Sequence, residues 1–431
     1  MKKVFYLLFM VMLTGVLLSS VVAKGSGTTK ITFWDENAGP NRTPYYEELI
    51  KRFEQKNPDI KVEYVGLPWS NAKQKYDVAI AANALPDCGG MPLIFVSGFV
   101  MKNSLLELDK YFDKWDQKSK MSSLILTANR SLAKNHKLYM LPNTTTMSVF
   151  WYRSDVYKSL GLTAPQSWDQ LYDNIKATTS QSKNTYGFSL RGGPGSVQQL
   201  EDMMFAYSGI TNYFTKNGKC TVNSPKNVEA VKRFVAMYKV YTQESDITSG
   251  YKEMVAAFDS GRAMMIQHNL GSYGEHLKAL SPEQFAACPF PVSETGKRVI
   301  KGGQANGYGI FRNSKHPAEA WRFISYLCSA EAQSYWNYHI GQMPTHSDVY
   351  KEDWVKKYPH IEMAGKAMAD KNSVIILQPF YLPDYSAILS QFVEPSFQEV
   401  LLGRKTPEQF LNEWAAAMEK AKASYDKANK K

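Results

Sequence analysis

Clustered catalytic and metal-binding motifs are absent from this sequence. No HExxH motif and no nucleophile elbow occur, the seven histidines are scattered, and none of the four cysteines lies in a CxxC pair. Beyond the first apolar segment, no run approaches the roughly 20 apolar residues that a membrane-spanning helix needs. These absences argue against a zinc hydrolase, an esterase of the nucleophile-elbow type and a multi-spanning membrane protein.

Cysteine is scarce. The four cysteines are Cys88, Cys220, Cys288 and Cys328. They allow three complete disulfide pairings, among which a sequence cannot choose, and an exported compartment permits such bonds. Buried free thiols explain the four residues equally well, so both interpretations stay open.

Long blocks of one charge are also missing. The formal net charge is +11, but basic and acidic residues are mixed along the chain, except for the lysine-rich end from Lys420 to Lys431. No basic run interleaves with aromatic residues, as a nucleic-acid-binding surface requires. We therefore interpret the basic residues as ordinary surface charge and expect no nucleic-acid partner.

The N-terminus carries the one long apolar run. Lys2 and Lys3 precede an apolar segment over residues 4–18, and Val21-Val22-Ala23 fits cleavage after Ala23. Small polar residues interrupt the run, which favours a cleaved leader over a retained anchor. No cysteine lies near the cleavage position for lipid attachment. We predict a signal peptide over residues 1–23 and an exported, periplasmic mature protein.

What the sequence does have is an alternation of strand and helix patterns over 431 residues, a length that suits two or three domains. The first strand and helix patterns alternate at residues 30–34, 44–53, 60–65, 71–83 and 91–95. This β-α-β-α-β succession predicts a parallel sheet, in which ligand-facing residues lie at the carboxyl ends of the strands. By that rule, four side chains gather at one edge of the sheet: Trp34, Asp35, Trp69 and Asp87.

The stretch from Leu138 to Arg153 interrupts this alternation. It opens apolar, breaks at Pro142, continues through Asn143 and three threonines, and resumes as a strand at residues 147–152. An ordinary strand with a polar edge is one interpretation, because threonine favours strands. The other is a strand that leaves one lobe, crosses a ligand cleft and enters a second lobe.

A glycine-rich turn from Arg191 to Ser196 precedes a predicted helix. Such a turn can hold a phosphate at the helix N-terminus. It lacks the Lys-Ser/Thr ending of a P-loop, so a plain tight turn is the simpler interpretation.

Several short motifs occur in order along nearly the whole mature chain. They are Ile31-Thr32-Phe33-Trp34, Asn57-Pro58, Leu85-Pro86-Asp87, Leu141-Pro142, Trp151-Tyr152-Arg153, Gly261-Arg262-Ala263-Met264-Met265, Gly302-Gly303, Ala320-Trp321 and Met343-Pro344-Thr345. In this order they resemble the extracellular solute-binding proteins of family 1, which serve carbohydrate ABC importers. The resemblance implies an α/β, two-lobed periplasmic-binding-protein fold (type II-like), with a hinge of several chain crossings.

On this resemblance we expect the mature chain to divide between two lobes. Lobe 1 is expected over residues 24–142 and again over 267–320, and lobe 2 over residues 143–266 and 321–431, the latter with the C-terminal helices. Closure is expected about the crossings near residues 143–147 and 267–271, two short polar breaks between apolar strands.

Carried over by position, the resemblance implies ligand-binding residues in both lobes: Trp34, Asp35, Trp69, Asp87, Asn143, Thr144, Thr145, Arg191, Asn269, Gly271, Gly303, Gln304 and Tyr381. Aromatic rings suit the apolar faces of a pyranose, and amides and carboxylates suit its hydroxyls. The family has small or aliphatic residues after Pro-Asp, whereas Cys88-Gly89-Gly90 follows Asp87 here, so the local backbone is expected to differ.

The expected function is delivery of a sugar or oligosaccharide to the permease subunits of an ABC importer, by a monomer without cofactor, metal ion or catalytic activity. Two other solutes stay open: a glycerol phosphate diester, favoured by Arg191 and its turn, and a polyamine, for which Asp35, Asp87 and Asp384 offer acids. A secreted glycan-active enzyme requires two carboxylates about 5–5.5 or 6.5–9.5 Å apart, and no pattern pairs Asp35, Glu36 and Asp87 in this way.

Overall fold

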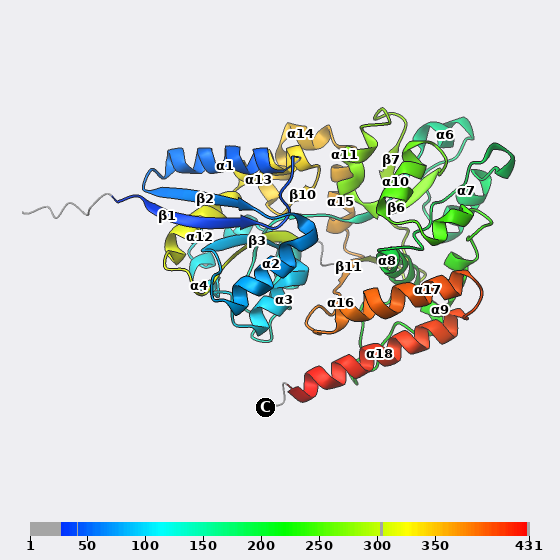
Figure 1. Cartoon of the computed structure of the whole chain (residues 1–431). Helices are drawn as coiled ribbons and strands as arrows, with labels where there is room; N and C mark the ends of the chain where they lie inside the picture. Colours follow the sequence, from blue (N-terminus) through cyan, green and yellow to red (C-terminus); the bar gives the residue numbers. More distant parts are fainter. Residues whose placement is uncertain (1–26, 41, 302–304, 429–431) are drawn as a thin grey trace, which may run out of the picture.

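Two lobes lie side by side in the computed structural model, which describes residues 27–40, 42–301 and 305–428 (Figure 1). Lobe 1 is built on a six-stranded sheet with the strand order β10-β4-β9-β3-β1-β2. Lobe 2 is built on a three-stranded sheet, β6-β5-β7, and a two-stranded one, β11-β8. The predicted two-lobed α/β architecture is therefore confirmed.

The sheet of lobe 1 is mixed. Its strands are β1 (Thr29–Asp35), β2 (Ile60–Gly66), β3 (Cys88–Pro92), β4 (Leu141–Thr145), β9 (Asn306–Ile310) and β10 (Met343–Pro344). The strands β1, β2 and β3 are parallel, as the β-α-β-α-β pattern predicted, whereas β9 runs antiparallel to β3 and β4. The helices of this lobe are α1 (Thr43–Lys56), α2 (Trp69–Ala81), α3 (Leu93–Met101), α4 (Asp109–Phe112), α5 (Ser123–Arg130), α12 (Pro317–Leu327) and α13 (Ala330–Ile340).

Helical spacing of apolar residues explains how α1 covers this sheet. A proline lies in its first turn, where a missing N–H has no cost, and Tyr46, Leu49, Ile50 and Phe53 form its buried face. These side chains join one core cluster with Phe33 of β1. The yellow helices α12 and α13 pack into the same cluster, beside the blue N-terminal elements in Figure 1.

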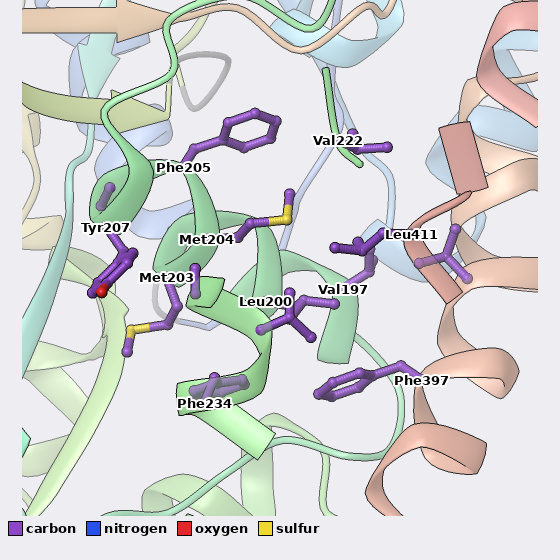
Figure 2. Close-up of a cluster of buried hydrophobic side chains, with 14 of the residues drawn as sticks. Val197, Leu200, Met203, Met204, Phe205, Tyr207, Val222, Phe234, Phe397 and Leu411 are labelled. Carbon is purple, nitrogen blue, oxygen red and sulfur yellow. The ribbon is translucent and has the colours of Figure 1, made fainter. Parts of the chain in front are cut away.

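Lobe 2 surrounds a buried helix. Its strands are β5 (Ser148–Tyr152), β6 (Met265–Asn269), β7 (Ala286–Cys288), β8 (Arg298–Lys301) and β11 (Ser373–Ile376), and its helices are α6 (Ser154–Ser159), α7 (Trp168–Ala177), α8 (Ser196–Ser208), α9 (Pro225–Val235), α10 (Tyr251–Asp259), α11 (Tyr273–His276), α14 (Asp353–Lys356), α15 (Pro359–Ala369), α16 (Tyr385–Ala387), α17 (Glu394–Leu401) and α18 (Pro407–Ala428). Nearly every residue of α8 is buried. Figure 2 shows Leu200 of α8 among Phe234 of α9, Phe397 of α17 and Leu411 of α18.

The chain passes between the lobes through three segments whose flanking residues are described. The first joins β4 to β5, as the polar break at residues 143–147 predicted. The second leads from β8 to β9, and the third follows β10. These strand ends form the hinge of the fold.

The strand pairing differs from the expected lobe boundaries in two places. Residues 267–271 are not a crossing, because β6 pairs with β5 along its length and the chain then turns back within lobe 2. A polar turn after an apolar strand has the same pattern whether the chain crosses or turns back. The helix α12 begins before residue 321, and both α12 and α13 pack in lobe 1, because an amphipathic pattern does not specify which sheet a helix covers.

All four cysteines are buried as free thiols, which decides between the two interpretations that the sequence left open. Burial raises the pKa of the Cys288 thiol to about 12 and that of Cys220 to about 11. Over the described residues, no helix combines the length and the apolar character needed to cross a membrane.

Candidate functional site

Two buried carboxylates stand at the carboxyl end of β1. Both oxygens of Asp35 are bonded: the Tyr64 hydroxyl donates to one at 2.8 Å, and the Asn37 N–H donates to the other at 3.0 Å. In contrast, Oε2 of Glu36 is buried and has no partner among the described residues. Its nearest cation is Arg42, whose guanidinium lies 3.9 Å from Oε1. Burial and the neighbouring Asp35 raise the pKa of Glu36 to about 7, against the opposing effect of Arg42.

A chain of aromatic and polar side chains links this edge to the first crossing. The Arg42 guanidinium lies 4.8 Å from the ring centre of Trp336. The Tyr46 and Tyr308 hydroxyls are 3.2 Å apart, and the Asn143 side-chain amide donates to Tyr308 at 2.7 Å. The predicted residue Asn143 is therefore committed to an internal network that joins α1, β9 and β4.

The two predicted threonines on the crossing strand are also buried. Thr144 donates to the Asn337 side chain at 2.6 Å and lies 3.2 Å from the Met343 carbonyl, so it fastens β4 to α13 and β10. Thr145 lines a cavity of about 590 Å³ between α5 of lobe 1 and α15 of lobe 2. Thr144 is bonded within the crossing, whereas Thr145 is held by its strand pairing with Met343 of β10, and both residues are buried.

Asp87 does not lie at the predicted edge. The strand β3 begins at Cys88, which pairs with Phe33, so Asp87 lies at the amino end of β3, beside Thr32 in the middle of β1. It accepts the Thr32 N–H at 2.9 Å and the Ser314 hydroxyl at 2.6 Å. The placement was wrong because Asp87 precedes β3 and so lies at the amino end of that strand, whereas Asp35 ends β1 and lies at its carboxyl end.

The two glycines that follow Cys88 have a steric explanation. A Cβ on Gly90 would lie 2.1 Å from Oε2 of Glu36, and one on Gly89 would lie 2.4 Å from the Tyr76 hydroxyl. The small residues in β3 thus make room for Glu36 on one face and for Tyr76 on the other.

Of the two predicted tryptophans, Trp69 is the open one. It begins α2, its side chain is 49% exposed, and its ring stacks on Phe95 of α3 with 5.9 Å between centroids and 10° between planes. Trp34 is half-buried against Tyr76, at 5.4 Å between ring centroids. Trp69 therefore presents a flat ring face, whereas Trp34 mainly fills core.

The lobes also meet at β11 and the segment that follows it. Ile375 and Phe380 of lobe 2 pack against the lobe 1 cluster that contains Leu93 and Phe95. The next residue, Tyr381, lines a cavity of about 300 Å³ with residues of α3 from lobe 1 and Tyr425 of α18 from lobe 2. In Figure 1, α18 extends from lobe 2 towards lobe 1 below this contact. The predicted residue Tyr381 thus lies between the lobes.

Arg191 lies in the glycine-rich turn before α8. Its guanidinium is buried and donates to the Pro194 carbonyl at 2.8 Å. The helix N-terminus already holds an anion of the chain itself, because the Glu394 carboxylate accepts the Gly195 N–H at 2.6 Å. This carboxylate occupies the helix N-terminus at which the sequence allowed a phosphate to bind.

Asn269 and Gly271 form the turn at the end of β6. The Asn269 side chain accepts the Gly271 N–H at 2.8 Å. The backbone carbonyl of Asn269 accepts the Trp151 indole N–H at 3.2 Å. Asn269 is half-buried and Gly271 is exposed. Gly303 and Gln304 lie outside the described residues.

Sequence reasoning missed a buried ionic cluster in lobe 2, formed by Glu201, Asp202 and Lys301. The available signal was a pair of adjacent acids in the otherwise apolar second half of α8, where a solvated helix face would have spaced its charges by three or four residues. Sequence reasoning also missed Arg42, which is the N-cap residue of α1 and lies beside Glu36.

The chain matches known proteins over most of its length. Residues 39–334 match the family model described as bacterial extracellular solute-binding protein. The arabinooligosaccharide-binding protein of Bacillus subtilis is 26% identical over 97% of this chain and 99% of that protein. The multiple sugar-binding protein of Streptococcus mutans is 24% identical over 85% of this chain and 88% of that protein.

Solved structures share the architecture. The sugar-binding protein MalE from Xanthomonas citri superposes with a TM-score of 0.80 at 17% identity, covering 94% of this chain and 100% of that one. The GacH receptor of Streptomyces glaucescens gives 0.76 at 20% identity, over 91% and 98% of the two chains. At these identities the likeness establishes the periplasmic-binding-protein fold.

Proposed function

Because this chain belongs to the family of bacterial extracellular solute-binding proteins, we propose that it binds a sugar or an oligosaccharide and delivers it to an ABC importer. The observation that carries the choice of solute is the Trp69 ring, half-exposed and stacked flat on Phe95. Such a face suits the apolar side of a pyranose. The named sugar-binding relatives support the same choice. The family consists of transport binding proteins and is not catalytic.

Trp69 and Tyr381 are the residues that we propose as solute contacts. Tyr381 lies at the contact between the lobes, and Trp69 stacks on a member of the lobe 1 cluster that lobe 2 touches. Asn143, Thr144 and Arg191 are already bonded within the protein, so we assign them to the crossing and to the turn before α8.

The other solutes lose the features that favoured them. The Glu394 carboxylate occupies the turn that favoured a phosphate, and two of the acids that favoured a polyamine, Asp35 and Asp87, already accept hydrogen bonds from the protein. No feature of the described residues therefore favours a phosphodiester or a polyamine over a sugar.

We also propose that the protein acts as a monomer outside the cytoplasm, with its leader removed after Ala23 and no lipid anchor. The permease subunits of the importer are the partners that the family implies. Mass spectrometry of the exported protein tests the cleavage position: a mature chain that starts at Lys24 supports it, and an acylated or uncleaved N-terminus contradicts it.

The experiment for the proposed function is a titration followed by tryptophan fluorescence, with monosaccharides, oligosaccharides, polyols, phosphodiesters and polyamines as separate solutes. We expect a saturable change with at least one sugar. Binding of only a phosphodiester or a polyamine would contradict the proposal. The Trp69→Ala variant is the control that assigns the signal to the site.

A further inference from the structure

Three ionic side chains are buried together in lobe 2. Lys301, the last residue of β8, places its Nζ 3.2 Å from Asp202 and 3.6 Å from Glu201, and donates to the Gln198 carbonyl at 2.8 Å. The side chains of Lys301, Glu201 and Asp202 are 3%, 0% and 4% exposed. Burying charged groups is unfavourable unless partners compensate fully, and apolar residues of similar volume are often as stable. The cluster therefore requires a reason other than stability.

The two carboxylates accept hydrogen bonds from distant parts of the chain. Glu201 accepts from the hydroxyls of Tyr213 at 2.7 Å and Tyr385 at 2.8 Å, and from the Gln378 amide at 2.8 Å. Asp202 accepts from the Ser148 hydroxyl at 2.8 Å and the Gln267 amide at 2.9 Å. Five donors from four segments of the chain thus converge on two adjacent residues of α8.

Most of these donors lie next to the segments that lead to the space between the lobes. Ser148 is the first residue of β5 after the crossing, and its direct strand partner is Asn269. Gln267 lies two residues before Asn269, and Gln378 lies three residues before Tyr381. Lys301 ends the last lobe 2 strand before the chain returns to lobe 1. The cluster therefore contacts the ends of two of the three segments that join the lobes, at Ser148 and Lys301, and also β6 and the Tyr381 segment.

We propose that Glu201, Asp202 and Lys301 are positioning residues for solute binding, which hold these segments in register from inside lobe 2. The proposal rests on the proposed function. Directional bonds to fixed carboxylates determine where each donor lies, whereas apolar packing alone tolerates repacking. Lys301 supplies the positive charge without which two adjacent carboxylates would repel each other in a buried site.

Hydrogen–deuterium exchange tests the proposal without any solute. The Lys301→Met variant leaves the two carboxylates without their cation, and we expect amide exchange at residues 146–150, 265–271 and 374–385 to rise about tenfold or more. Exchange in lobe 1 helices should not change. Adding Asp202→Asn to this variant removes one negative charge, which balances the lost lysine, and keeps an acceptor for Ser148. Amide exchange at the three segments should then return to within about threefold of that in the unmodified protein.

The matched control is Asn174→Ala in α7. This amide is buried in the same lobe and donates to the Thr163 carbonyl at 2.9 Å, away from the three segments. It should lower the melting temperature without a selective rise in exchange at the three segments. If Lys301→Met does not fold, Asp202→Asn alone is measured, with an expected rise of about threefold in the two segments that contain Ser148 and Gln267.

Affinity gives the second readout, with the sugar identified by fluorescence. We expect Lys301→Met to weaken binding at least about tenfold, Asn174→Ala to leave it unchanged, and the double variant to regain most of it. A uniform rise in exchange across lobe 2 with unchanged affinity would overturn the proposal and leave an ordinary core ion cluster. If the unmodified protein binds none of the solutes, the proposed function fails, while the exchange result still decides this inference.

Discussion

Adjacent residues at the end of β1 have very different surroundings. Asp35 accepts two hydrogen bonds from the protein, whereas Glu36 is buried beside it with one oxygen unpartnered among the described residues. A buried carboxylate without donors favours its protonated form.

Glu36 should make the protein less stable as the pH rises. Its pKa, about 7 in the folded protein, lies above its ordinary value of 4.5, so between these values the folded state binds a proton that the unfolded state does not. The free energy of unfolding should fall across this window, by roughly 2–3 kcal/mol for this group. Urea denaturation at pH 5 and pH 8 should show the fall, and Glu36→Gln should reduce it by that amount.

The control for Glu36 is Glu48→Gln, at an exposed carboxylate whose pKa is lowered by its hydrogen bond with Arg52. It titrates below the window, so the fall between pH 5 and pH 8 should persist. An equal fall in Glu36→Gln and in the unmodified protein would show that other groups cause the dependence.

Trp69 should contribute to binding and little to folding. Its half-exposed ring stacks on Phe95, so Trp69→Ala should weaken sugar binding by roughly 1–3 kcal/mol, on the order of ten- to hundredfold, through lost area burial at about 25 cal/mol per Å². Titration calorimetry measures the affinity, and thermal unfolding should show a nearly normal melting temperature. Trp414, fully buried in lobe 2, is the contrasting site, where Trp→Ala should cost about 3–5 kcal/mol of stability. Normal affinity in Trp69→Ala excludes this ring from the site.

At the scale of single elements, the N-terminus of α8 binds a carboxylate from another helix of the same chain. The helix begins after the left-handed Gly195, and Glu394 at the start of α17 supplies the negative charge that a helix N-terminus favours. A π-helical turn, Ile388–Val393, precedes Glu394. The C-terminal helices are thereby docked onto the central helix of lobe 2.

Glu394→Ala should therefore open a phosphate site that the unmodified protein does not offer. Loss of the cap should cost about 1–2 kcal/mol of stability. Inorganic phosphate should then raise the melting temperature of the variant by about 2–4 °C at a concentration near ten times its dissociation constant, because it binds the folded state alone. Thermal unfolding with and without phosphate measures this. An equal rise in the unmodified protein would mean that the turn before α8 binds phosphate with Glu394 in place.

Helices were easier to predict than strand limits. The spacing of Tyr45, Leu49, Ile50 and Phe53 predicted α1, because a buried helix face follows from local periodicity. In the structure the buried face contains Tyr46 and the last three of these residues. The start of β3 was misplaced because Cys-Gly-Gly has little strand propensity and is held extended by its neighbours β1 and β9. The placement of Asp87 failed for a different reason, because this residue precedes β3 and lies at the amino end of that strand.

The whole molecule shows which site features depend on long-range contacts. Residue types and order predicted the lobes, the first crossing and the exposed Trp69, because these follow from local patterns. Asn143 and Thr144 are bonded to Tyr308 and Asn337, which are more than 160 residues away in sequence. No local pattern could therefore predict that these two side chains are used inside the protein. Long-range contacts also determine the bond between Glu394 and the Gly195 N–H and the ionic cluster around Lys301, so local patterns could not predict them.

We propose closure of the lobes over a sugar, with Trp69 of lobe 1 and Tyr381 of lobe 2 as contacts and the segments that join the lobes as the hinge. Small-angle X-ray scattering, without solute and at saturating sugar, tests it most directly. We expect a smaller radius of gyration with the sugar, and no change in Trp69→Ala at the same concentration. An unchanged radius for the unmodified protein, at a sugar concentration that saturates its fluorescence, would contradict the account.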